Sequence, residues 1–236
     1  MPISQLAQLL TPQQITRVHE ASLHILSEVG MLVRNEDARD VFARHGCQVN
    51  AETHFVTFPS QIVEHFREAF PPTFTFYARD PQYDVTLPDD RPVILTGSSA
   101  PNVIDPVSGN ERRARSDDIA RIAHLINELP GYDVFSVSTL ADDAPEGHFS
   151  LARYYPALKN CAKPVRGNMP TVEQALQVVR VGEIIAGGAE AYRARPFVTH
   201  HCCPCVSPLT MDWDSTALLL AMCRENLPIY ASIVPN

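Results

Sequence analysis

From about residue 92 onward, the chain alternates between segments typical of β-strands and segments typical of α-helices. Five short β segments are separated by four helical stretches. The β segments cover residues 93–96, 133–139, 163–168, 197–203 and 228–232. Strands that are joined through helices run parallel, and helices cover both faces of such a sheet. The alternation therefore predicts an α/β fold, either an open doubly wound sheet or a (β/α) barrel.

Two features bear on the choice between these folds. Gly97-Ser98-Ser99 follows the first β segment, but the sequence has no G-x-G-x-x-G turn of the kind that binds dinucleotides. A closed barrel needs eight strands, whereas about five are present and the last ends close to Asn236. If the fold is a barrel, we therefore expect the chain to be an incomplete fragment.

Residues 1–91 do not show this regular alternation of strands and helices. Thr11 and Gln14 form a predicted capping box at the start of a helix, and Gly30 marks its end. Alternating residues then predict short strands at 55–58, 73–78 and 83–87. We therefore expect an N-terminal helical and β region over residues 1–91 and a separate β/α region over 92–236.

Composition excludes several classes of protein. With 19 basic and 27 acidic residues the net charge is −8, which argues against a nucleic acid as the main partner. The longest apolar run, Ala217 to Cys223, is far shorter than a membrane span. Met1 to Leu10 lacks the basic start of a signal peptide, and the six cysteines do not form a disulfide pattern. We expect a cytoplasmic protein with reduced thiols that does not bind membranes.

The carboxyl ends of the β segments are the best candidates for a functional site. Barrel enzymes place their chemistry at these ends, and alternation along a strand separates apolar side chains from polar ones. The polar positions form a predicted substrate-binding set. Its members are Ser98, Ser138, Arg166, Asn168, His201 and Cys203. The alternative is that these groups are polar packing satisfied within the protein.

The stretch from His200 to Cys205 is rich in possible metal ligands. Neighbours on a strand point to opposite faces, so at most alternate residues such as His201 and Cys203 converge. A complete metal site would need further ligands from elsewhere. A metal-dependent hydrolase that uses His201 and Cys203 is therefore a second candidate function, and a buried strand end is the simpler interpretation.

Charged loops allow two interpretations as well. Asp142, Asp143 and Glu146 could attract a cationic amine, or they could stabilise the start of a helix. Arg112, Arg113 and Arg115 could contact an acidic partner, or they could lie on a solvated hairpin.

Several stretches, taken in order, are similar to the trimethylamine methyltransferase family, the MttB-like corrinoid-dependent methyltransferases. Among them are the Tyr-Ala-Arg-Asp-Pro and Val-Ser-Pro-Leu sequences. The matching stretches are residues 19–30, 77–81, 100–105, 108–109, 112–113, 163–165, 186–188, 195–197 and 206–209. Their order along residues 10–236 carries the resemblance. One departure is Cys203-Pro204, where relatives tend to have Asn-Pro.

The resemblance implies a fold and an activity. Family members are TIM barrels about twice as long as this chain, so residues 92–236 would form the first half of a barrel, truncated after about the fifth strand. They transfer a methyl group from a methylated amine, of the trimethylamine or betaine type, to the cobalt of a corrinoid (cobalamin) carried by a separate protein. The expected partners are therefore a corrinoid protein and a methylated amine, and the full-length protein is expected to be a homo-oligomer.

The same resemblance limits what can be assigned. The founding enzymes carry a pyrrolysine in the half that this chain lacks, so no catalytic residue is assigned here. We expect no cofactor to be bound directly, because the corrinoid belongs to the partner. A non-catalytic remnant or binding module with the same half-barrel surface is the alternative to an active methyltransferase.

Overall fold

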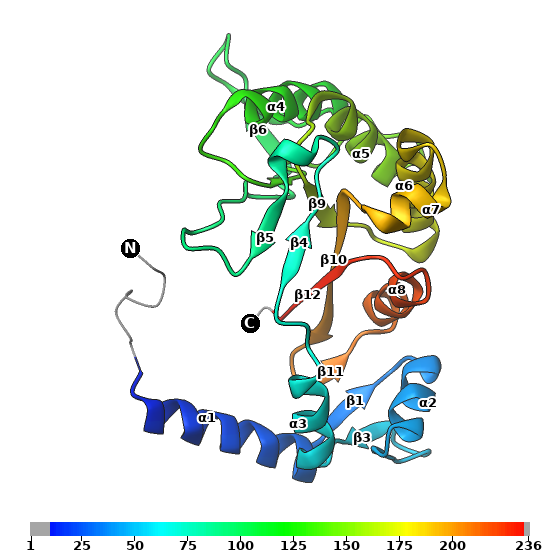
Figure 1. Cartoon of the computed structure of the whole chain (residues 1–236). Helices are drawn as coiled ribbons and strands as arrows, with labels where there is room; N and C mark the ends of the chain where they lie inside the picture. Colours follow the sequence, from blue (N-terminus) through cyan, green and yellow to red (C-terminus); the bar gives the residue numbers. More distant parts are fainter. Residues whose placement is uncertain (1–9, 234–236) are drawn as a thin grey trace. The chain divides into compact units, whose positions relative to one another are not determined.

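The computed structural model describes residues 10–233 of the chain (Figure 1). It has an α/β fold with a mixed sheet and divides into two compact units. The β/α unit comprises Thr73–Cys202 and Ala221–Tyr230, and the N-terminal unit comprises the residues up to Pro72 with Cys203–Leu220 and the last residues from Ala231. The predicted boundary between residues 91 and 92 stays a prediction.

The β/α unit is built on parallel strands. β8 (Phe135–Ser136) pairs in parallel with β9 (Val165–Asn168), and β9 pairs in parallel with β10 (Val198–Val206). α5 (Phe149–Asn160) connects β8 to β9, and the connection from β9 to β10 contains α6 (Val172–Ala186) and α7 (Ala189–Ala194). The predicted alternation of parallel strands and helices is therefore confirmed for this part of the chain.

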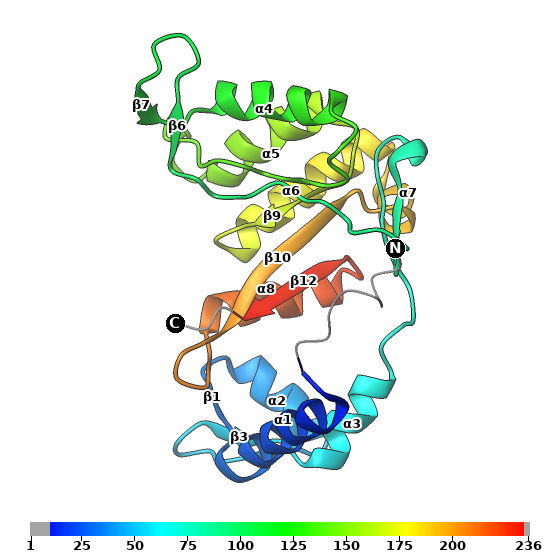
Figure 2. The ribbon, with the colours of Figure 1, turned by 90° about the vertical axis from the view of Figure 1, so that its left-hand side faces the viewer.

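Apolar alternation explains why these strands form. Phe135, Val165 and Val198 are almost completely buried, and so is Tyr154 of α5. α4 (Ser116–Glu128), α5 and α6 lie next to one another in chain order (Figure 2). Burying these apolar residues against the helices supplies the main stabilising free energy of the unit, at roughly 25 cal/mol per Å².

The sheet departs from the prediction at its first segment, whereas the last predicted strand is present. Residues 93–96 form no continuous strand, and the isolated parallel bridges Leu95–Val134 and Ala100–Thr139 join this part of the chain to its neighbour. β12 (Ile229–Ile233) pairs with β10. The strands run in the order β2-β3-β1-β11-β10-β9-β8, and they do not close into a barrel within residues 10–233.

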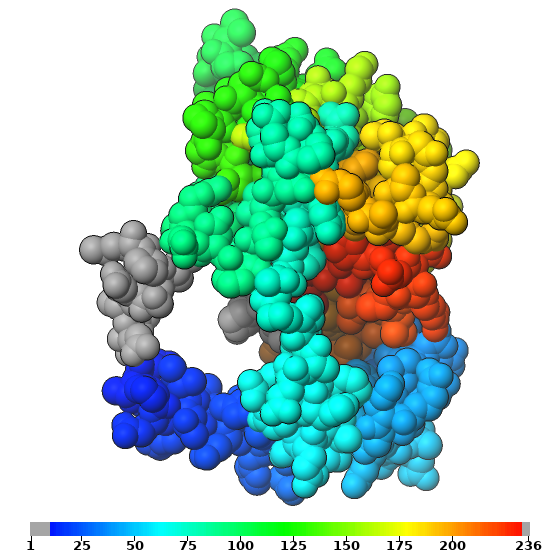
Figure 3. Space-filling model, viewed as in Figure 1, coloured from blue at the N-terminus to red at the C-terminus, as the bar shows by residue number. Residues whose placement is uncertain are grey.

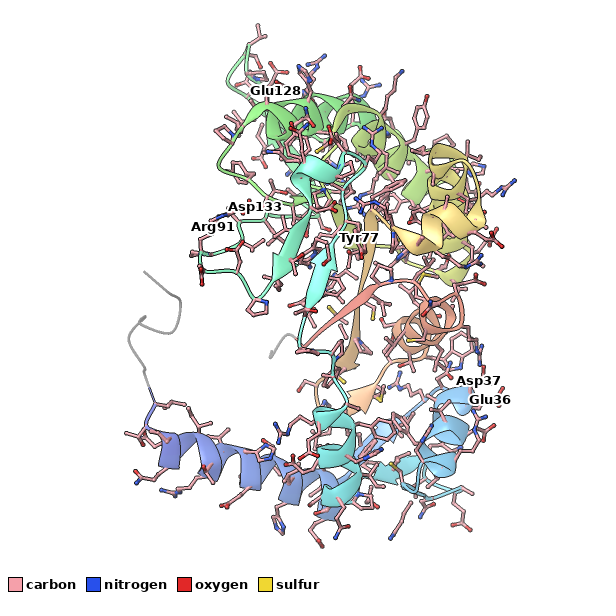
Figure 4. The ribbon with its side chains drawn as sticks, viewed as in Figure 1. Glu36, Asp37, Tyr77, Arg91, Glu128 and Asp133 are labelled. Atoms are coloured by element: carbon pink, nitrogen blue, oxygen red, sulfur yellow. The ribbon has the colours of Figure 1, made fainter. Side chains whose placement is uncertain are left out.

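The segment before β8 is held by an ion pair. Arg91 donates to both carboxylate oxygens of Asp133 at 2.7 and 2.8 Å, and the two side chains lie together in Figure 4. Asp133 also accepts a hydrogen bond from the backbone N–H of Ile94 at 2.8 Å. These side-chain contacts replace part of the ladder that a regular strand would have formed.

Two hairpins complete the β/α unit. β4 (Phe74–Phe76) pairs antiparallel with β5 (Val85–Leu87), with the short helix η3 (Pro81–Tyr83) between them. This hairpin lies on the surface of the unit (Figure 3). β6 (Asn102–Ile104) pairs antiparallel with β7 (Glu111–Arg113), as the turn residues between them predict.

The N-terminal unit joins distant parts of the sequence. It contains α1 (Pro12–His24), η2 (Ile25–Val29), β1 (Met31–Val33), α2 (Glu36–Arg44), β2 (Gln48–Val49), β3 (Phe55–Thr57) and α3 (Ser60–Glu68). β1 pairs antiparallel with β3 and parallel with β11 (Thr210–Met211). α8 (Trp213–Arg224) follows β11. The core of this unit forms where Val33, Val56 and Met211 meet.

The first helix begins as predicted. The Thr11 hydroxyl accepts from the Gln14 backbone N–H, and the Gln14 side chain accepts from the Thr11 N–H, which completes the capping box. Its apolar stripe remains in contact with solvent: Ile15 is 53% exposed and Val18 is 59% exposed. None of the helices in the described part of the chain is both long enough and apolar enough to cross a membrane.

Candidate functional site

The carboxyl ends of β8 and β9 lie beside residues 198–201 of β10, whose own carboxyl end continues to Val206 and pairs with β11. Ser136 pairs with Arg166, and Arg166 pairs in turn with Thr199. Two residues further along each strand, Asn168 pairs with His201. Because β9 ends beside the first half of β10, the fold brings together Arg166, Asn168 and His201, which the sequence placed in one predicted set.

Alternation sorts the side chains of this edge. His200 is 0% exposed, whereas its neighbour His201 and the facing Arg166 are half-buried. Neither ring nitrogen of His200 has a hydrogen-bond partner in the described residues, and burial lowers its pKa from 6.5 to about 4. His200 is thus a neutral core residue, and His201 is the more exposed imidazole of the two.

An aromatic side chain organises the half-buried polar groups. The Arg166 guanidinium lies 4.8 Å from the centre of the Tyr230 ring, and the His201 ring stacks on Tyr230 at 5.5 Å. Burial first, and the charge of Arg166 second, lower the pKa of His201. The imidazole is therefore neutral at neutral pH. We call Ser99, Arg166, Asn168, His201 and Tyr230 the strand-end cluster.

A buried arginine supports the cluster from α5. Arg153 is 0% exposed, and its Nε donates to the carbonyl oxygen of Thr139 at 3.0 Å. Its terminal nitrogens donate to the carbonyl oxygens of Val137 and Asn168, both at 3.3 Å. The Ser99 hydroxyl donates to Asn168 Oδ1 at 3.1 Å. The guanidinium thus fixes the ends of neighbouring strands next to the cluster.

Sequence reasoning missed both Arg153 and Tyr230. Arg153 occupies a buried position of α5, although arginine side chains are normally exposed. The only sequence signal was that this arginine falls among residues expected to pack on the sheet. Tyr230 comes from β12, and its partners depend on the pairing of that strand with β10.

The other predicted residues lie apart from these contacts. Ser98 is exposed, and its neighbour Ser99 makes the hydrogen bond to Asn168. Ser138 Oγ is buried with no hydrogen-bond partner in the described residues. Cys203 belongs to the N-terminal unit, where its Sγ lies 3.1 Å from Ser232 Oγ. All six predicted substrate contacts remain predictions, and three of them share the strand-end cluster.

Comparison with known proteins identifies the family. Residues 3–234 match the family model for trimethylamine methyltransferase (MTTB). The chain belongs to the trimethylamine methyltransferase family.

The similar curated proteins of this family have different substrates in their names. The chain is 28% identical, over 96% of its length, to a glycine betaine methyltransferase of Desulfitobacterium hafniense strain Y51. It is 24% identical over 92% of its length to a trimethylamine methyltransferase of another strain of that species, and 26% identical over 94% to one of Methanosarcina mazei. The matches cover 47%, 44% and 46% of those proteins, so the chain spans about half their length.

In this member of the trimethylamine methyltransferase family, the histidine and cysteine run does not gather a set of metal ligands within residues 10–233. No three His, Cys, Asp or Glu side chains within the described residues lie close enough together to hold a metal ion. His201 stacks on Tyr230, and Cys203 contacts Ser232. The metal-hydrolase alternative therefore has no ligand set in residues 10–233.

The acidic loop that contains Asp142 and Asp143 contacts arginine side chains and the N-terminus of α4. Asp142 Oδ1 accepts from Arg113 Nη2 at 2.9 Å. Asp143 Oδ1 accepts from the backbone N–H of Ser116 at 2.8 Å, which places a carboxylate at the start of α4. Arg115 lies 3.7 Å from the other oxygen of Asp143. Both carboxylates are therefore engaged: Asp142 pairs with Arg113, and Asp143 lies at the start of α4 rather than at the helix that follows its own loop.

The arginines of the β6–β7 hairpin are not all solvated, because Arg112 is engaged by carboxylates. Arg112 donates to both carboxylate oxygens of Asp118 at 2.7 and 2.8 Å and to Asp105 at 3.1 Å. Hydrogen bonds from the Ser108 backbone and from Arg112 lower the pKa of Asp105 to about 2. This network locks the β6–β7 hairpin onto α4.

The N-terminal unit contains an apolar cavity of about 590 Å³. Phe42, Phe58 and Phe66 contribute to its lining. Two further lining residues, His19 and Arg67, each contact the carboxylate of Glu64. The cavity lining is mostly apolar, whereas polar side chains of the predicted set meet in the strand-end cluster, so we take the strand-end cluster as the candidate functional site.

Proposed function

We propose that this chain is part of a methyltransferase that removes a methyl group from a methylated amine and passes it to a corrinoid carried by another protein. The family match over residues 3–234 is the observation that carries the proposal. The relatives named for glycine betaine and for trimethylamine support a methylated amine as the methyl donor.

We also propose that the β/α unit is part of a TIM-type barrel. The parallel order β10-β9-β8 and the helices that connect these strands support this assignment. In such barrels the chemistry takes place at the carboxyl ends of the strands. The strand-end cluster, with Arg166, Asn168 and His201, then faces the substrate.

We propose that the corrinoid is carried by the partner protein, where its reduced cobalt would supply the nucleophile for the methyl group. The role of this chain is to bind the amine, orient one methyl group toward the partner and exclude water.

The test combines binding with methyl transfer. The chain is titrated with methylated amines and followed by NMR, and it is then mixed with a reduced corrinoid protein and the same amines. We expect binding of a methylated amine, and formation of methylcobalt, seen in the absorbance spectrum, indicates an active enzyme. Binding without transfer favours the binding-module alternative. If no methylated amine binds and none is demethylated, the proposed function is wrong.

A further inference from the structure

The apolar cavity of the N-terminal unit has a buried inner wall and an exposed rim. Phe42 and Phe58 pack edge to face with ring centres 5.0 Å apart, and both contact the core cluster that contains the buried Cys47. On the outer side, Phe66 is exposed and Phe70 is 75% exposed. The cavity of about 590 Å³ therefore opens from the core of the unit to its surface, and its volume and aromatic lining are typical of a ligand site.

One face of α3 supplies much of the lining. Ile62 and Phe66 are four residues apart, so their side chains leave the same side of the helix. The same spacing relates Val63 to Arg67. α1 lies beside α3 and contributes His19 (Figure 1). Because apolar surface gains roughly 25 cal/mol per Å² when it leaves water, this face favours a ligand with an apolar body.

The polar side chains of the lining all carry nitrogen groups. They are His19, His45 and Arg67, and no Asp or Glu belongs to the lining within the described residues. Arg67 is exposed at the rim, and its Nε donates to Glu64 Oε2 at 2.6 Å. Its two terminal nitrogens have no acceptor within residues 10–233. The rim therefore presents hydrogen-bond donors that a ligand can reach.

Glu64 leaves one edge of this guanidinium available. One of its oxygens contacts His19 and the other accepts from Arg67 Nε. These hydrogen bonds lower the pKa of Glu64, so it stays a carboxylate and keeps the Nε side of Arg67 engaged. The opposite edge has two parallel N–H groups, which match the two oxygens of a carboxylate. A cationic head group would instead be repelled by the guanidinium.

We propose that the cavity of the N-terminal unit binds a carboxylic acid with an apolar chain, such as a medium-chain fatty acid, and that Arg67 binds its carboxylate at the rim. The apolar chain lies against Phe42, Phe58 and Ile62, whereas the carboxylate stays at the surface, where its charge remains hydrated. The strand-end cluster belongs to the β/α unit. Binding at the cavity is therefore independent of the methyl transfer proposed above.

The test compares ligands that have the same chain and different head groups. Decanoate, decanol and decylamine are titrated into the full chain at concentrations at which they stay monomeric, and binding is followed by calorimetry and by NMR of the methyl groups. We expect decanoate to bind about tenfold more tightly than decanol, and decylamine to bind least. The methyl signals of Ile62 and Val63 should shift, whereas those of Val137 in the β/α unit should not.

Three variants separate the head-group contact from the apolar contacts. Arg67→Gln should remove the preference for decanoate over decanol, because it removes the guanidinium and leaves the apolar walls in place. Arg44→Gln is the matched control, since Arg44 is an exposed arginine of α2 outside the lining, and the preference should not change. Val63→Trp fills the cavity and should weaken decanoate and decanol alike.

The other outcomes overturn the proposed site. Equal binding of decanoate and decanol, or an unchanged preference in folded Arg67→Gln, contradicts the role of the guanidinium. Binding that leaves the signals of Ile62 and Val63 in place puts the acid elsewhere on the chain. If these signals depend on protein concentration without ligand, a second copy of the chain occupies the cavity instead. If Arg67→Gln does not fold, the ligand series on the unaltered chain decides. None of these results bears on methyl transfer.

Discussion

Arg153 of α5 donates through Nε to the backbone carbonyl oxygen of Thr139 at 3.0 Å, although its side chain is completely buried. Burial lowers the pKa of the guanidinium, and no carboxylate within the described residues forms an ion pair with it. Its partners are carbonyl oxygens at the ends of β8 and β9 and beyond β8. A cation that is solvated by strand-end carbonyls fixes the edge on which the candidate site depends.

Replacing Arg153 should therefore destabilise the β/α unit. Arg153→Met keeps much of the apolar stem but leaves the carbonyl oxygens of Val137, Thr139 and Asn168 without this donor. Because each hydrogen bond from a buried charged group contributes about 1.5–3 kcal/mol, and some of these carbonyl oxygens keep other donors, we expect the free energy of unfolding to fall by about 3 kcal/mol. Urea denaturation followed by circular dichroism measures the change.

An exposed arginine on the next helix is the control for this experiment. Arg180 pairs only with Glu183 at the surface of α6 among the ion pairs of the described residues. Arg180→Met should change stability by less than about 0.5 kcal/mol. Equal effects of Arg153→Met and Arg180→Met would show that the buried guanidinium has no special structural role.

Gly167 of β9 lies close to Tyr154 of α5. A Cβ atom at this position would collide with the hydroxyl oxygen of Tyr154. We therefore expect Gly167→Ala to destabilise the protein by about 1–3 kcal/mol, as overpacking of a core does. Tyr154→Phe removes that oxygen, so it should cost less in the Gly167→Ala background than in the original chain. A double-mutant cycle by thermal or urea unfolding measures this coupling.

Gly131 provides the matched glycine. Its Cβ would meet no atom within 4 Å. Gly131→Ala should therefore be close to neutral, and additive effects of Gly167→Ala and Tyr154→Phe would contradict the predicted collision.

The ion pair between Arg91 and Asp133 should make stability depend on acid pH. The hydrogen bonds from Arg91 hold the pKa of Asp133 below its usual value of 3.8. A carboxyl group with a lowered folded-state pKa stabilises the protein above its unfolded-state pKa, and this contribution is lost as the pH falls below about 4. Asp133→Asn should cost about 1 kcal/mol at pH 7 and less at pH 3.

Urea denaturation at both pH values tests this linkage. Asp142→Asn is a useful comparison, because Asp142 is half-exposed and forms a single ion pair with Arg113. A loss of stability in Asp133→Asn that is as large at pH 3 as at pH 7 would contradict the electrostatic explanation.

Much of the β/α unit could be predicted because its signals are local. Alternation around Val165 and Val198 identified strands, and the helices between them required parallel pairing. The N-terminal sheet could not be predicted in the same way. β1 and β11 are only a few residues long, and Leu32 pairs with Thr210 across most of the chain. Such short strands are defined by distant partners rather than by their own periodicity.

The candidate site shows the same division. Arg166, Asn168 and His201 could be predicted from two rules. Alternation along a strand places Arg166 and Asn168 on one face, and parallel pairing brings Asn168 opposite His201. The stacking of Tyr230 and the burial of Arg153 depend on tertiary contacts that no local pattern encodes. The acidic loop allowed two interpretations, a site for a cationic amine or the start of a helix. Asp142 instead pairs with Arg113, which lies 29 residues earlier in the chain, and no local pattern indicates this contact.

His200 gives the chain a second source of pH dependence, in a different range. Its pKa is lowered from 6.5 to about 4 by burial, so the folded state holds the imidazole neutral. The unfolded state binds a proton from pH 6.5 downward, and the folded state does so only near pH 4. Acidification between these values therefore favours unfolding, by about 1.4 kcal/mol per pH unit.

Replacing this imidazole should remove that dependence. We expect the original chain to lose about 2 kcal/mol between pH 7 and pH 5, and His200→Phe to lose much less over the same interval. Urea denaturation at pH 7, 6 and 5 measures both slopes, with His124→Gln on the exposed face of α4 as the control. If His200→Phe and His124→Gln keep the slope of the original chain, another group causes the acid sensitivity and His200 is already protonated or well solvated in the fold.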